Sequence, residues 1–162
     1  MEIQQCWSRF VNAEKLLKQG SWPEAKHLFS QVLDSLPSHV YHALECKQTR
    51  PCQFVFLVTG LRDASIYQSS ILNSIGEPQQ AFETLNRCYA LLQFLSLEQT
   101  QLIKIVYAAI EESTDLVLSH MEAFCASQHS AEWTRKFNEL SRSHHSIAVL
   151  NPHTNPTPNS HY

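Results

Sequence analysis

Glycine is the residue whose scarcity most constrains this chain, because only Gly20, Gly60 and Gly76 occur among its 162 residues. Two-residue hairpin turns and phosphate-binding loops both rely on glycine, since they need positive φ angles or a close approach of the backbone. The strict alternation of apolar and polar residues that marks half-buried strands is also absent. The sequence therefore disfavours sheets and nucleotide-binding loops, and predicts a helical protein.

Apolar residues instead recur at the three-to-four spacing of a helix along almost the whole chain. Gly20 suits the left-handed position that ends a first helix. Ser21 and Glu24 have the capping-box spacing that starts a second helix, and Pro37 is expected to stop it. Further helices are predicted over about 38–48, 54–75, 81–95 and 98–124, with a last one from Ser130 to about 148.

These patterns predict one all-α domain over residues 1–150, with about six to seven helices. We expect antiparallel hairpins in a repeat-like array or a right-handed bundle, the last of them a long hairpin over about 98–148. The final segment, residues 151–162, contains three prolines and few apolar groups. It is expected to be a disordered tail that contributes nothing to the fold.

The charge distribution argues against several functional classes. The net charge is −3, and the 12 lysines and arginines are scattered rather than gathered into a basic footprint, so no nucleic-acid partner is expected.

The longest apolar-rich stretch, residues 51–61, is too short to span a bilayer as a helix, so no membrane partner is expected. The start of the chain lacks the pattern of a secretory signal, which predicts a cytoplasmic protein with reduced cysteines.

One group of residues in the sequence has the spacing of a metal site. His39, His42 and Cys46 are spaced so that a helix would place them on one face, where they could supply three ligands to zinc. The alternative is that they pack beside Tyr41 and Leu44 at the edge of a helix. No nucleophile motif and no dinucleotide-binding pattern is present, so no catalytic residue, metal or cofactor is predicted.

Residues 6–39 resemble one tetratricopeptide repeat, a helical hairpin with a period of about 34 residues. A weaker second copy covers about 62–95, because Gly76 and Ala81 repeat the spacing of Gly20 and Ala25. The residues that carry the resemblance in the first copy are a small residue, a turn residue, an aromatic-x-x-alanine run, two apolar residues and a closing proline, namely Ala13, Gly20, Trp22, Ala25, Phe29, Val32 and Pro37.

The resemblance implies a protein–protein interaction module, adaptor or chaperone-like, that binds a polypeptide in a groove between hairpins. The first helix has more large apolar groups than one packing stripe needs, so we expect Trp7, Phe10, Glu14 and Leu17 to be partner-binding residues. The alternative for Trp7 and Phe10 is that they belong to the core. The subset of the family that clamps a carboxylate uses Lys and Asn where this chain has Phe10 and Glu14, which disfavours that ligand.

Two other functional classes remain open at this stage. The first is a structural subunit whose apolar faces form a homodimer. The second is a metal-dependent or other enzyme whose site is assembled across helices.

Overall fold

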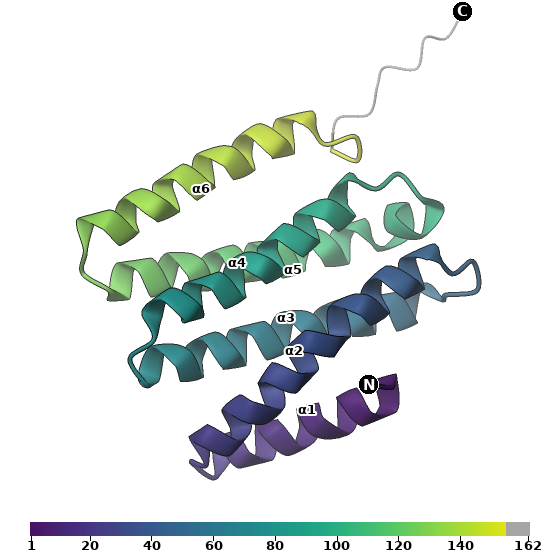
Figure 1. Cartoon of the computed structure of the whole chain (residues 1–162). Helices are drawn as coiled ribbons and strands as arrows, with labels where there is room; N and C mark the ends of the chain where they lie inside the picture. Colours follow the sequence, from purple (N-terminus) through teal and green to yellow (C-terminus); the bar gives the residue numbers. More distant parts are fainter. Residues whose placement is uncertain (155–162) are drawn as a thin grey trace, which may run out of the picture.

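The computed structural model describes residues 1–154, and every regular element within them is an α-helix (Figure 1). Consecutive helices run antiparallel and are joined by short turns, so the chain forms three hairpins placed side by side. The prediction of an all-α fold is confirmed. The helices are α1 (Ile3–Lys18), α2 (Trp22–Glu45), α3 (Pro51–Ser74), α4 (Pro78–Leu97), α5 (Gln101–Ser127) and α6 (Ala131–Leu150).

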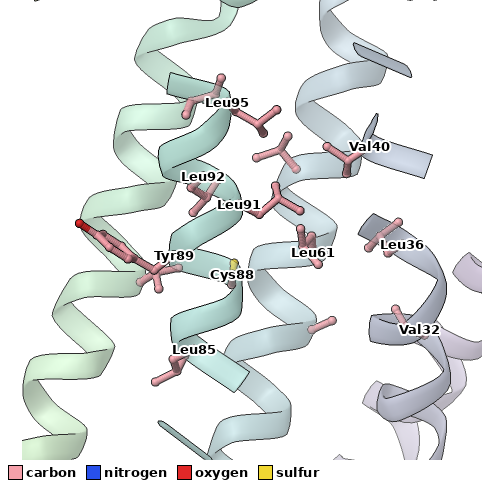
Figure 2. Packing of buried hydrophobic residues seen from close by; sticks show 14 of the residues in the cluster. Val32, Leu36, Val40, Leu61, Leu85, Cys88, Tyr89, Leu91, Leu92 and Leu95 are labelled. Carbon is pink, nitrogen blue, oxygen red and sulfur yellow. The ribbon is translucent and has the colours of Figure 1, made fainter. Parts of the chain in front are cut away.

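The hairpins share one continuous core. Helix α3 contacts α2, α4 and α5, and thereby joins the three hairpins. Figure 2 shows apolar side chains of α2, α3 and α4 pointing into the space between these helices. Phe29, Phe54 and Leu92 are among the largest fully buried side chains. Burial of this kind contributes about 1.5–3 kcal/mol for each large apolar side chain, which favours the stacked arrangement over separate hairpins.

The first two hairpins, α1–α2 and α3–α4, each have the same type of turn between their two helices. Gly20 and Gly76 have φ angles of +79° and +82°, in the left-handed region that favours glycine. In each turn the residue after the glycine donates its N–H to the carbonyl five residues earlier, at 2.9 Å. These bonds satisfy carbonyls at the end of the first helix, as expected of a glycine stop. Five residues after each glycine, Ala25 and Ala81 are both fully buried.

Helix α2 corrects one prediction from the sequence. It continues through Pro37 to Glu45, so the expected stop at Pro37 and the separate helix over 38–48 are both wrong. A proline inside a helix removes one backbone hydrogen bond and costs about 3 kcal/mol. On either side of it, Leu36 and Val40 are fully buried in the shared core. Burial of these two side chains offsets the cost of the proline and keeps the helix continuous.

The chain also makes contacts beyond the last helix. Asn151 is buried, and its amide nitrogen donates to the backbone oxygen of Ser96 at 3.2 Å. The ring of His153 stacks on Tyr107 with centroids 4.7 Å apart. The prediction that the chain contributes nothing from Asn151 onward is therefore wrong for these two residues. The rest of the expected tail, 155–162, lies outside the described residues.

Substitution at Ala25 tests the close approach of helices in the first hairpin. Because Ala25 has no exposed surface, Ala25→Leu is expected to lower the free energy of unfolding by about 1–3 kcal/mol through overpacking. The matched control is Lys26→Leu, since the Lys26 side chain is partly exposed and loses only a 3.9 Å ion pair with Glu77. That control should stay within about 1 kcal/mol of the wild type. Urea denaturation measures both, and equal effects would contradict the close approach.

Candidate functional site

A hollow of about 580 Å³ lies between the C-terminal ends of α2 and α4. It is at the end of the array where the α2–α3 and α4–α5 connections are found. Its volume falls within the range of about 300–1,000 Å³ that is usual for binding pockets. The lining combines apolar and aromatic side chains with polar and charged ones, and comprises Tyr41, Leu44, Glu45, Cys46, Lys47, Thr49, Phe94, Glu98, Thr100, Gln101 and Leu102.

Two aromatic side chains from different helices meet at this hollow. The rings of Tyr41 and Phe94 have centroids 5.6 Å apart and are nearly perpendicular, in an edge-to-face arrangement. They nevertheless remain 42% and 44% exposed, and Leu97, just beyond Phe94 on α4, is 46% exposed. Helices α2 and α4 thus present large apolar groups to solvent beside a concave surface, the combination that marks many interaction sites.

The connections around the hollow are fixed by their own sequence. Pro51 occupies the first position of α3 and holds the preceding Arg50 in an extended conformation. The side chain of Gln53 accepts a hydrogen bond from the Arg50 backbone N–H at 3.1 Å. The Thr49 hydroxyl donates to the Ala43 carbonyl at 2.7 Å, which satisfies one of the free carbonyls at the end of α2. The α2–α3 connection is therefore ordered by local hydrogen bonds.

The second connection is capped as well. Helix α4 ends at Leu97, and Glu98 follows in an extended conformation. Thr100 then starts α5, since its side-chain oxygen accepts from the Ile103 N–H at 3.2 Å. The positions of Phe94 and Leu102, on either side of this connection, follow from these two helix ends.

The lining of the hollow carries both signs of charge. Glu45 and Glu98 supply carboxylates, and Lys47 supplies an ammonium group. The C-terminal ends of α2 and α4 add partial negative charge from their last carbonyls. The hollow therefore offers apolar and aromatic surface beside charged groups of both signs.

The three residues whose spacing would suit zinc, His39, His42 and Cys46, do not form a metal site. The ring nitrogen Nε2 of His39 lies 2.9 Å from the Met1 carbonyl, whereas His42 and Cys46 are exposed farther along α2. Within residues 1–154, no three or more His, Cys, Asp or Glu side chains are arranged to hold a metal ion.

The structure places the aromatic residues predicted on the first helix against α3. Trp7 is half-buried, and its ring covers Gly60 and lies 4.7 Å from the ring of Phe56. Phe10 is also half-buried, with its ring 5.9 Å from that of Phe29. Both side chains contribute to the contact between the first two hairpins and pack against the core.

The other two residues predicted on this face also contact their surroundings. Glu14 accepts a hydrogen bond from the Tyr67 hydroxyl at 3.2 Å. Burial raises the pKa of the Tyr67 hydroxyl, and the hydrogen bond to Glu14 raises it further. Leu17 is half-buried and packs against the core. The four predicted residues are thus on one side of α1, turned toward α3 and the core.

Sequence reasoning did not single out Tyr41 and Phe94 as functional residues. For Phe94 a signal exists, because it falls outside the apolar stripe of α4 that includes Leu92 and Leu95. A large aromatic residue off the buried stripe of an amphipathic helix is expected to face solvent. For Tyr41 no such signal was available, because the predicted helix break at Pro37 separated Tyr41 from the apolar stripe of the first part of α2.

Comparison with known proteins gives no guide to the site: no family model, no curated protein and no solved structure matches this chain. Among the six described helices, none combines the length and the apolar character that crossing a membrane requires.

Proposed function

We propose that this chain is a protein-binding scaffold, and that the hollow between α2 and α4 receives an apolar side chain of a polypeptide partner. The observation that carries the proposal is the exposed pair of Tyr41 and Phe94. Aromatic residues are enriched among those that contribute most to protein–protein binding, particularly where they flank a pocket. In the free chain both rings keep apolar surface in water that a partner would cover.

The architecture supports the same proposal. Helical hairpins in an array form extended surfaces suited to binding peptides and helices. The likeness to tetratricopeptide repeats is part of this proposal, and its support is the matching pair of turns at Gly20 and Gly76 with the buried alanines that follow them. The proposed binding face differs from the one predicted on α1, because Trp7 and Phe10 already contact α3.

Affinity capture tests the proposal with three versions of the chain. The wild type, the double variant Tyr41→Ser with Phe94→Ser, and the control Ile75→Ser are each used to capture proteins from a lysate of cells that naturally produce the chain. Ile75 is 43% exposed, close to the values for the two aromatic residues. It directly follows the C-terminal end of α3, whereas the hollow is at the N-terminal end of this helix. We expect a polypeptide that the wild type and Ile75→Ser retain and the double variant loses.

The outcomes separate the functional classes. Equal retention of every captured protein by the double variant would contradict the proposed site. If the polypeptide lost from the double variant is a second copy of this chain, the alternative of a homodimer is favoured instead. A homodimer can be recognised in this experiment if the bait and the endogenous chain differ in mass, because the captured copy is then separate from the bait.

A further inference from the structure

Helix α6 is attached to the array differently from the other helices. None of its residues is buried, whereas α2 and α4, the second helices of the other hairpins, bury side chains along their length. It rests on α5 through the half-buried side chains of Trp133, Phe137 and Leu140. The opposite side of α6 is lined with exposed polar residues. Helix α6 is therefore held by fewer apolar contacts than its counterparts, and its detachment requires less of the core to open.

Aromatic packing holds the first turns of α6. The ring of Trp133 lies edge-on to Phe124 and Phe82, with centroids 5.2 and 5.4 Å apart. The ammonium group of Lys136 lies 4.4 Å from the centroid of the Trp133 ring. None of these contacts involves a histidine.

The middle of α6 is held by a hydrogen-bonded cluster centred on His144. Its Nδ1 atom lies 2.8 Å from the amide nitrogen of Gln93 and 3.0 Å from the hydroxyl oxygen of Tyr89, both on α4. The Gln93 nitrogen also donates to the Tyr89 hydroxyl at 2.9 Å. An amide nitrogen can only donate, so Nδ1 must accept, and it does so only when it carries no proton. The cluster is thus built for neutral His144.

We propose that α6 is a pH-sensitive strap: protonation of His144 at Nδ1 removes the acceptor that ties α6 to α4, and α6 then detaches more often from the α4–α5 face.

The groups around His144 set the direction of this response. Burial is the largest influence and lowers the pKa of His144; Asp115 and Glu111 on α5 raise it, His145 on α6 lowers it, and the net shift is downward. From α4, Tyr89 faces the ring, and burial raises the pKa of its phenol, so it carries no charge in acid. A histidine whose pKa is lowered on docking stabilises the docked helix fully above its ordinary pKa of about 6.5. This contribution is lost as the pH falls from that value through the lower pKa of the docked state.

The end of α6 is held independently of this switch. His153 Nε2 lies 2.8 Å from the Glu98 carbonyl, and the Nε2–H group can donate there whether or not the other ring nitrogen is protonated. Asn151 donates to Ser96, and neither residue titrates. Detachment of the strap would uncover Phe82, Tyr89 and Phe124, an apolar face on α4 and α5 suited to an amphipathic helix.

Hydrogen exchange on the full chain tests the strap. The opening of α6 amides is measured at pH 7.5, 6.5 and 5.5, after correction for the intrinsic exchange rates, with α1 amides as the internal reference. We expect opening of α6 to rise by up to about fivefold between pH 6.5 and 5.5, the limit for one histidine whose pKa is about 6.5 when α6 is detached, while α1 stays unchanged. His144→Asn retains an oxygen acceptor but does not titrate, so its α6 should open equally at all three values. His145→Asn should respond as the wild type does.

A rise of equal size in His144→Asn, or no rise in the wild type, would overturn the proposal. A second measurement keeps the test decisive if His144→Asn fails to hold α6. Nuclear magnetic resonance of the His144 ring should find Nδ1 unprotonated at pH 7.5 and a pKa below the ordinary value. A pKa at or above 6.5 would overturn the proposal whatever the variant does.

Discussion

Phe29→Ala should lower the free energy of unfolding by about 3–5 kcal/mol, because it removes a fully buried ring from the centre of the first hairpin and leaves a cavity. The ring it removes is stacked on Tyr67 at 5.4 Å between centroids, and it meets the ring of Phe10 edge to face at 5.9 Å. The matched control is Phe94→Ala, which deletes the same group from an exposed position. That control should change the free energy of unfolding by less than about 1 kcal/mol.

Urea denaturation at 25 °C measures both variants. The comparison matters for function as well as for the fold, since a residue proposed to bind a partner must be dispensable for folding. A loss of 3 kcal/mol or more in Phe94→Ala would place this ring in the core and contradict its proposed role.

Trp7→Ala has the second large expected effect, a loss of about 2–3 kcal/mol in the free energy of unfolding. This is less than the usual cost for a fully buried aromatic residue, because Trp7 is only half-buried. The sequence left two interpretations of Trp7 open, a groove residue or a core residue. Its ring contacts with Gly60 and Phe56 favour the second. A loss below 1 kcal/mol would favour the groove instead, since substitutions of exposed residues rarely cost more.

A double-mutant cycle with Gly60 is the control for this prediction. Alanine is favoured over glycine inside a helix by about 1 kcal/mol, so Gly60→Ala would ordinarily stabilise α3. Here a Cβ atom at position 60 would overlap the six-membered ring of Trp7, so this ring would have to shift away from its contacts with Phe56 and Phe10. Gly60→Ala should therefore destabilise the wild type by about 1–3 kcal/mol and stabilise the Trp7→Ala variant. Stabilisation in both backgrounds would contradict the contact.

The sequence predicted most of the helical segments because amphipathic periodicity and turn glycines are local signals. Gly20 and Gly76 ended their helices as expected. Pro37 misled the prediction because its effect on the backbone is local, whereas the burial of Leu36 and Val40 depends on the packing of α3 and α4. A local rule was overridden by tertiary contacts that no short window of sequence contains.

The candidate site was less accessible to sequence reasoning for the same reason. Tyr41 and Phe94 are more than fifty residues apart, and only the pairing of hairpins brings their rings together. Trp7 and Phe10 show the same dependence on packing, because their spacing along the helix suits a groove as well as a core. Whether such a face is open depends on how closely the next hairpin approaches, and Gly60 permits a close approach.

Site-specific crosslinking at position 94 tests the central claim most directly. A photoreactive benzoyl-phenylalanine in place of Phe94 should form a covalent product with a defined polypeptide in cells, and Tyr41→Ser in the same chain should reduce the yield of that product. The same amino acid in place of Ile75, which is similarly exposed, should not form the product. Equal yields from positions 94 and 75, or no polypeptide product at position 94, would contradict the claim that the hollow between α2 and α4 binds a partner.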